Sequence, residues 1–118
     1  MNLNSSLIQR GKKEGLIQFT HQGKRVNYPL SRQDFLLTPE EKVRITIYLQ
    51  LVLEYEYPPE CITMERKVKM GSGYKFVDIV VFRSKAHVED MILIECKRSN
   101  VSENAFKEAE KQGWLITQ

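Results

Sequence analysis

The stretch "MILIECK", from Met91 to Lys97, is an apolar run that ends on an acid and a base. Its composition and length predict a core β-strand, in which alternate side chains share a face. Glu95 and Lys97 are therefore expected side by side on one face. A charged pair at the end of a core strand loses hydration, and a metal ion or a phosphate group would compensate for that loss. The stretch predicts both a sheet and a charged site at its edge.

Two further strands precede this one. The segments "CITMERKVKM" (61–70) and "YKFVDIVVF" (74–82) are rich in apolar and β-branched residues and flank a Gly-Ser-Gly turn at 71–73. Together with residues 91–97 they predict a meander of three strands.

A helix is predicted before the meander, in "TPEEKVRITIYLQLVLEYEYPPE" (38–60). Thr38 is a favourable N-cap, and Glu41, three residues later, completes a capping box. Pro39 suits the first helical position, and the helix is expected to run to Tyr55, before the two prolines that stop it. The apolar residues that recur every fourth position and are expected to face the core are Val43, Ile47 and Leu51.

The two ends of the chain complete the predicted architecture. "LIQFTHQGKRVNYPL" (16–30) alternates around a Gln-Gly turn and predicts a short hairpin, while "ENAFKEAEKQ" (103–112) predicts a second helix. At 118 residues the chain is expected to form one α+β domain, with residues 1–35 as an N-terminal extension and residues 36–118 as the core.

Composition excludes several classes of protein. With 42% hydrophobic and 28% charged residues the chain is typical of a soluble globular protein. It has no apolar run of the roughly 20 residues that cross a bilayer, and no signal-peptide centre, so a cytoplasmic location is expected. Cys61 and Cys96 lack the spacing of a zinc site and are expected to be reduced thiols. The net charge of +3 permits nucleic-acid binding without requiring it.

The register of the last two strands brings two carboxylates together. Their apolar residues align when Phe82 lies opposite Met91, and the same antiparallel register places Asp78 opposite Glu95. Directly opposed side chains have Cβ atoms roughly 4.5 to 5.5 Å apart, which is close enough to bind one hard cation. Without a cation the two negative charges would repel each other.

This arrangement suits metal-assisted cleavage of a phosphodiester. Asp78 and Glu95 are the predicted ligands of Mg²⁺ or Mn²⁺, with the peptide carbonyl of Cys96 as a further oxygen ligand. Such an ion polarises the phosphate and lowers the pKa of a bound water, and Lys97 is placed to orient that water or to offset the charge of the transition state.

The segments "LLTPEEKVR", "YKFVDIVVF" and "LIECKRSNVSENAF" together resemble the PD-(D/E)xK nuclease superfamily, and in particular the N-terminal nuclease domain of type I restriction enzyme R proteins. The resemblance extends from about Leu36 to Gln112. It implies a restriction-endonuclease-like core with a central mixed sheet flanked by helices, DNA as substrate, and a glutamate near the start of the first helix in the site. Glu40 is the preferred candidate because it precedes Val43 by one turn, whereas the capping box accounts for Glu41.

The family pattern departs from this chain in two places. The helix after the ExK motif commonly carries a glutamine and a tyrosine, and the matching positions here are Glu108 and Gln112. The family's restriction enzymes also carry an ATP-driven motor, and no phosphate-binding loop is present in this sequence, so a motor domain or other restriction subunits are expected partners. Two functions follow: a Mg²⁺-dependent DNA endonuclease domain, or a catalytically inert nuclease-like fold that binds nucleic acid or protein.

Overall fold

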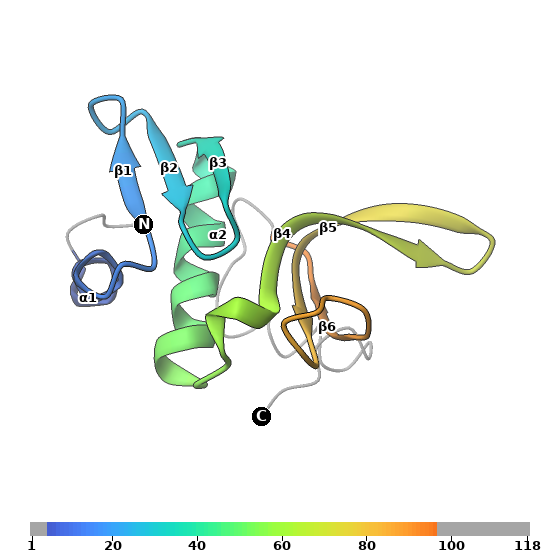
Figure 1. The fold of residues 1–118 in the computed structure, drawn as a ribbon. Coiled ribbons are helices and arrows are strands. Elements are labelled where there is room, and N and C mark those ends of the chain that lie inside the picture. Colours follow the sequence, from blue (N-terminus) through green and yellow to red (C-terminus); the bar gives the residue numbers. More distant parts are fainter. Residues whose placement is uncertain (1–4, 97–118) are drawn as a thin grey trace. The chain divides into compact units, whose positions relative to one another are not determined.

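The computed structural model describes residues 5–96, which group into two compact units divided between Pro59 and Glu60 (Figure 1). The first unit contains α1 (Ser6–Lys13), β1 (Gln18–Thr20), β2 (Arg25–Tyr28), β3 (Gln33–Leu36), α2 (Pro39–Leu49) and a π-helical turn (Gln50–Glu54). A 3-10 turn (Pro59–Cys61) leads to β4 (Ile62–Met70), β5 (Gly73–Phe82) and β6 (Asp90–Ile94) in the second unit. The α+β class is confirmed, and within residues 5–96 both sheets are antiparallel, whereas the family resemblance implied a mixed sheet.

The N-terminal segment contains more structure than the predicted hairpin. β1 and β2 pair around a turn at residues 21–24, and β3 adds a third strand on the other side of β2. α1 packs on α2 so closely that a Cβ added at Gly11 would lie 2.5 Å from Leu49 Cδ2. The residues before position 36 therefore pack with α2. The prediction of one domain for residues 1–118 stays a prediction.

The start of α2 is confirmed, and two of the three residues expected to face the core, Ile47 and Leu51, are buried. The Glu41 N–H donates to Thr38 Oγ1 at 3.1 Å, as expected of the N-cap, and the helix continues through the π-helical turn to residue 54. Val43 is only half-buried. The buried face also includes two polar residues, Glu41 and Arg44, which are hydrogen-bonded to each other. A search for recurring apolar residues could not identify them. The buried apolar residues are Ile45, Ile47, Tyr48, Leu49 and Leu51.

The second unit is the predicted meander, with strand order β4-β5-β6. Val80 lies opposite Leu93, which confirms the register expected for β5 and β6. The register shifts between Val81 and Phe82, so that Phe82 lies opposite Asp90 and the predicted pairing of Phe82 with Met91 is wrong. A bulge of this kind inserts one extra residue in one strand and increases the local twist, which sequence alternation does not reveal.

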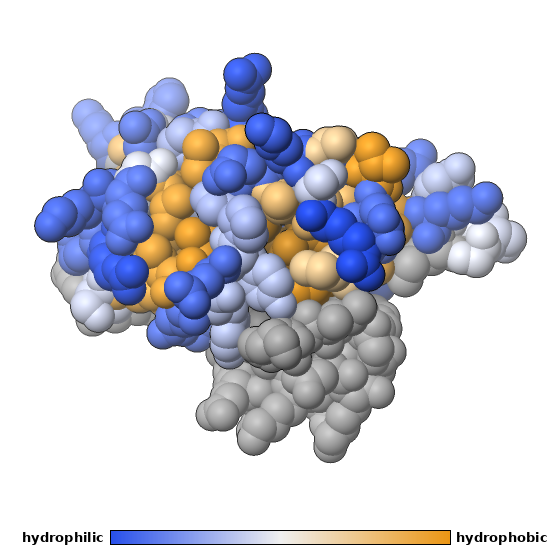
Figure 2. All heavy atoms as spheres, turned by 60° about the horizontal axis from the view of Figure 1, so that its bottom comes forward, coloured by the Kyte–Doolittle hydropathy of each residue, from blue (hydrophilic) through white to orange (hydrophobic). Residues whose placement is uncertain are grey.

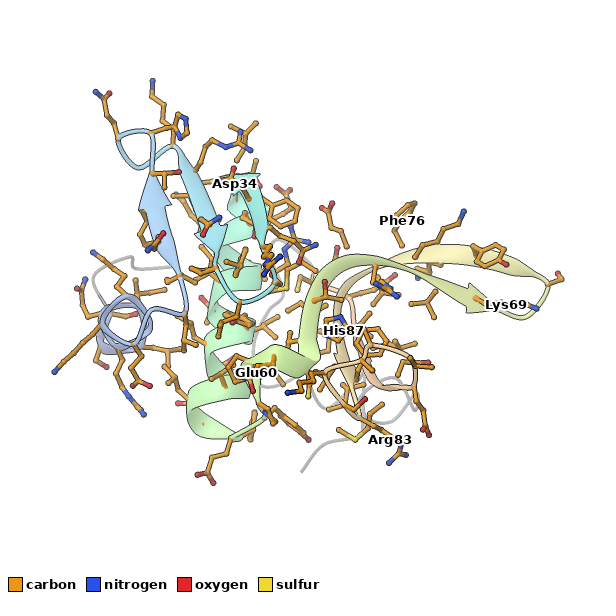
Figure 3. The ribbon with its side chains drawn as sticks, in the orientation of Figure 1. Asp34, Glu60, Lys69, Phe76, Arg83 and His87 are labelled. Carbon is orange, nitrogen blue, oxygen red and sulfur yellow. The ribbon has the colours of Figure 1, made fainter. Side chains whose placement is uncertain are left out.

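The β5–β6 connection is held by His87. Its ring stacks on Phe82 with centroids 4.8 Å apart, and its Nε2 lies 2.8 Å from the carbonyl oxygen of Glu60 (Figure 3). These contacts anchor the connection at the start of β4. The other end of the meander is different, because β6 pairs only with residues 79–82 of β5 and the β4–β5 hairpin extends beyond it as a two-stranded arm (Figure 1).

Candidate functional site

Asp78 lies on β5 between two buried residues, Val77 and Ile79, and its own side chain is half-buried. Its Oδ2 accepts a hydrogen bond from the backbone N–H of Cys96 at 2.6 Å. A hydrogen bond to a carboxylate is stronger than one between neutral groups, so it fastens the chain after β6 to β5. Asp78 and Cys96, 18 residues apart in sequence, therefore meet just after the end of β6.

Glu95 directly follows β6, which ends at Ile94 and not at Lys97 as predicted. Its carboxylate is three-quarters buried and forms an ion pair with the Lys75 ammonium of β5. Sequence reasoning missed Lys75. The alternation of β5 assigns that residue to the opposite face from Asp78, so the sequence gives no indication that it reaches Glu95.

The donor set of this site suits a hard cation. The predicted ligands are the carboxylates of Asp78 and Glu95 and the peptide carbonyl of Cys96, all of them oxygen atoms of the kind Mg²⁺ and Mn²⁺ prefer. Within residues 5–96 no group of three or more histidine, cysteine, aspartate or glutamate residues is arranged to hold a metal. That is compatible with Mg²⁺, which typically takes one or two carboxylates and completes its shell with water and substrate phosphate.

Glu40 was expected to point inward and Glu41 to remain at the helix end, but their burial is reversed. Glu40 is exposed on the first turn of α2, whereas Glu41 is only 4% exposed. The preference for Glu40 rested on the wrong helix phase. A catalytic role of Glu40, or an accessory role of Glu41, stays a prediction.

Glu41 belongs to a buried cluster that the sequence analysis did not find. Its Oε2 accepts hydrogen bonds from the Tyr28 hydroxyl at 2.5 Å and from Arg44 Nε at 3.1 Å, and its Oε1 pairs with the second guanidinium nitrogen. The capping box expected for Glu41 is incomplete, because the Thr38 N–H donates to the Leu36 carbonyl and not to the Glu41 carboxylate. The Arg44 guanidinium also lies over the Phe35 ring, 4.3 Å from its centroid. The spacing of Glu41 and Arg44, three residues apart on a helix, was the available signal.

Burial raises the pKa of the Tyr28 phenol well above its ordinary value, and the negative charge of Glu41 raises it further. Arg44 opposes this effect only in part. Tyr28 is therefore a hydrogen-bond donor at any physiological pH. The tyrosine also packs edge-on against Tyr48, with ring centroids 5.3 Å apart, so the cluster links the first sheet to α2.

Three predicted site residues lie outside the described residues. They are Lys97, which completes the ExK motif, and Glu108 and Gln112 of the predicted second helix. Their assigned roles stay predictions.

Residues 39–113 match the family model of the type I restriction enzyme R protein N terminus, which covers more than half of the chain. The chain belongs to this family. The match includes the aspartate of β5 and the whole ExK segment, and it confirms the resemblance based on sequence motifs. No curated protein and no solved structure matches the chain. Membership of the R protein family supports a nuclease-like domain of a restriction system. No helix among residues 5–96 is long and apolar enough to cross a membrane.

Proposed function

We propose that this R protein N-terminal domain is a metal-dependent endonuclease that hydrolyses phosphodiester bonds of DNA. The observation that carries the proposal is the hydrogen bond from the Cys96 N–H to Asp78, which joins the strand aspartate to the residue that follows Glu95. A purely structural strand end has no need of two carboxylates in adjoining backbone segments, because like charges destabilise it.

Asp78, Glu95 and the carbonyl of Cys96 would hold the ion. When bound, Mg²⁺ or Mn²⁺ supplies polarisation of the phosphate and a more acidic water. Lys97 would offset the negative charge that develops on the phosphate oxygens. A fixed cation in this role stabilises mainly the transition state. In the hydrolysis the water oxygen bonds to phosphorus, one ester P–O bond breaks, and the departing oxygen takes a proton.

The inert nuclease-like fold remains as the second candidate, and one observation favours it. Lys75 already neutralises Glu95, and the Cys96 N–H already satisfies Asp78, so the site is compensated by the protein alone. A domain of this kind would bind DNA or a partner subunit without cutting. DNA, the other subunits of the restriction system and a motor domain carried by another part of that system are the proposed partners.

Calorimetric titration of Mn²⁺ into the chain and into Asp78→Asn tests the metal site directly. Asp34→Asn is the matched control, because it removes one exposed carboxylate on β3 that pairs with Arg25. We expect the control to bind the ion as the wild type does, and Asp78→Asn to bind at least tenfold more weakly, since it loses a charged ligand.

A plasmid-nicking assay with and without chelator, run with the partner subunits present, tests the chemistry. Cleavage that persists in Asp78→Asn and in chelator would contradict the metal mechanism. Metal binding without cleavage in the assembled system would establish the inert fold.

A further inference from the structure

The β4–β5 arm, residues 66–77, is a second feature that the cleavage chemistry does not use. We call it the distal ribbon. It has no third strand among the described residues, because β6 pairs only with residues 79–82. Figure 3 shows the ribbon standing away from the rest of its sheet, with Lys69 near the tip and Phe76 projecting from the surface.

The distal ribbon carries most of the positive charge of the second unit's sheet. Residues 66–77 contain one arginine and three lysines and no acidic residue, a net charge of +4. The other residues of the second unit, 60–65 and 78–118, include six basic and nine acidic residues, a net charge of −3. Within this unit the positive charge therefore lies in one protruding element, whose visible surface is mostly hydrophilic at the right of Figure 2.

Two aromatic side chains lie among these charges. The ladder places Lys67 opposite Phe76 and Lys69 opposite Tyr74, so the four side chains share one face. The Lys67 ammonium lies 4.8 Å from the centroid of the Tyr74 ring, which supports that assignment. Tyr74 and Phe76 are 65% and 68% exposed, unusually high values for aromatic rings on a strand.

Protection against aggregation explains only part of this pattern. Lysines on an exposed strand edge prevent pairing with another sheet. That role does not call for exposed Tyr74 and Phe76, which would promote association. Rings interleaved with lysines suit a ligand that offers both phosphate charge and apolar sugar and base surface.

We propose that the distal ribbon binds duplex DNA in the major groove, with Lys67 and Lys69 on the phosphates and Tyr74 and Phe76 against sugars and base edges. Neighbouring strands lie about 4.8 Å apart, and a two-stranded ribbon with its side chains fits a groove about 12 Å wide. The choice of DNA rests on the proposed function. The four side chains proposed to contact DNA are separate from the carboxylates Asp78 and Glu95.

The other two cations of the ribbon anchor its base. The Arg66 guanidinium lies 5.4 Å from the centroid of the Phe82 ring and within hydrogen-bond distance of the His87 carbonyl, while Lys75 pairs with Glu95. Both residues therefore connect the ribbon to the body of the sheet. They are left unchanged in the test.

Fluorescence anisotropy of a labelled duplex, in chelator so that no cleavage occurs, tests the proposal on the full chain. The double variant Lys67→Gln/Lys69→Gln is expected to bind roughly tenfold more weakly and to lower the slope of log affinity against log salt by about 2. The matched control Lys12→Gln/Lys13→Gln removes the same charge from the exposed end of α1 and is expected to bind as the wild type does. Equal losses in both variants would overturn the proposal in favour of overall charge.

A second pair of measurements tests the aromatic face and the form of DNA. Tyr74→Ser/Phe76→Ser is expected to weaken duplex binding about tenfold with an unchanged salt slope, because it removes no charge. Undiminished binding by this variant, or tighter binding of a single strand of the same length, would overturn groove binding. Because binding is read in chelator, failure of the ribbon proposal is distinguishable from failure of the nuclease proposal, which concerns cleavage and Asp78.

Discussion

The two units each contain a carboxylate beside a cation, and the two pairs have different surroundings. Glu41 and Arg44 have side chains 4% and 5% exposed, and both Glu41 oxygens are bonded within the cluster. In the second unit Glu95 and Lys75 are 25% and 41% exposed, beside a second carboxylate, Asp78. The first pair is enclosed and complete, whereas the second remains open to solvent.

The two pairs are expected to differ in how much each contributes to stability. An enclosed pair contributes through the large cost of leaving either partner alone, typically about 3 to 5 kcal/mol. A partly exposed pair such as Glu95 and Lys75 contributes less, about 1 kcal/mol, so its cation can be displaced at a lower cost. At Glu95 the proposed metal ion would therefore displace Lys75 at little cost.

The largest expected effect is on stability in the first unit. Arg44→Ala leaves Glu41 buried without its cation and should lower the free energy of unfolding by about 3 to 5 kcal/mol. Urea denaturation measures this loss. Arg25→Ala, which breaks the half-exposed pair with Asp34, is the control and should cost less than about 1 kcal/mol. Similar losses in the two variants would remove the distinction between enclosed and open pairs.

The second prediction concerns a variant that should lose DNA cleavage but keep its stability. Lys97→Ala should lower the rate of DNA cleavage at least about a hundredfold, as loss of one preorganised transition-state donor does elsewhere. Mn²⁺ affinity and the midpoint of thermal unfolding should stay near wild type, in contrast to Arg44→Ala. Single-turnover nicking assays and calorimetry measure these quantities. A large loss of metal affinity would show that Lys97 supports the carboxylates instead.

The third prediction uses the raised pKa of Tyr28. The folded state keeps the phenol proton at pH values where the unfolded chain loses it, so the contribution of Tyr28 is complete below about pH 10 and declines as pH rises further. The free energy of unfolding should therefore fall by up to about 1.4 kcal/mol per pH unit above that value. Tyr28→Phe should lower stability by about 1.5 to 3 kcal/mol at pH 7 and reduce the alkaline slope. An unchanged slope in urea titrations at pH 9 to 11 would exclude Tyr28 as its source.

The smallest expected effect is at the open pair. Lys75→Gln should change the free energy of unfolding by less than about 1 kcal/mol and tighten Mn²⁺ binding by up to about fivefold, because the ion no longer competes with the lysine. Scanning calorimetry measures the change in stability, and titration calorimetry measures the change in Mn²⁺ affinity. Weaker Mn²⁺ binding would mean that Lys75 positions Glu95 for the metal.

Local sequence patterns were sufficient to predict the start of α2, the three-strand meander and the family. Thr38 and Pro39 define the start of α2 through backbone chemistry confined to one turn. The apolar strands and the glycine turn between them define the meander, and period-two alternation was sufficient to place Val80 opposite Leu93. The strand aspartate and the ExK segment identified the family.

Only the tertiary structure decided which charges are compensated, and by which partners. Glu41 bonds to Tyr28 across 13 residues, and Lys75 meets Glu95 from the neighbouring strand. No local propensity encodes either contact. α1 is equally dependent on packing, because eight mostly polar residues do not form a stable helix in water, and it exists by its contact with α2. Sequence periodicity reports average burial along one element, whereas the pairing of buried charges depends on which elements meet.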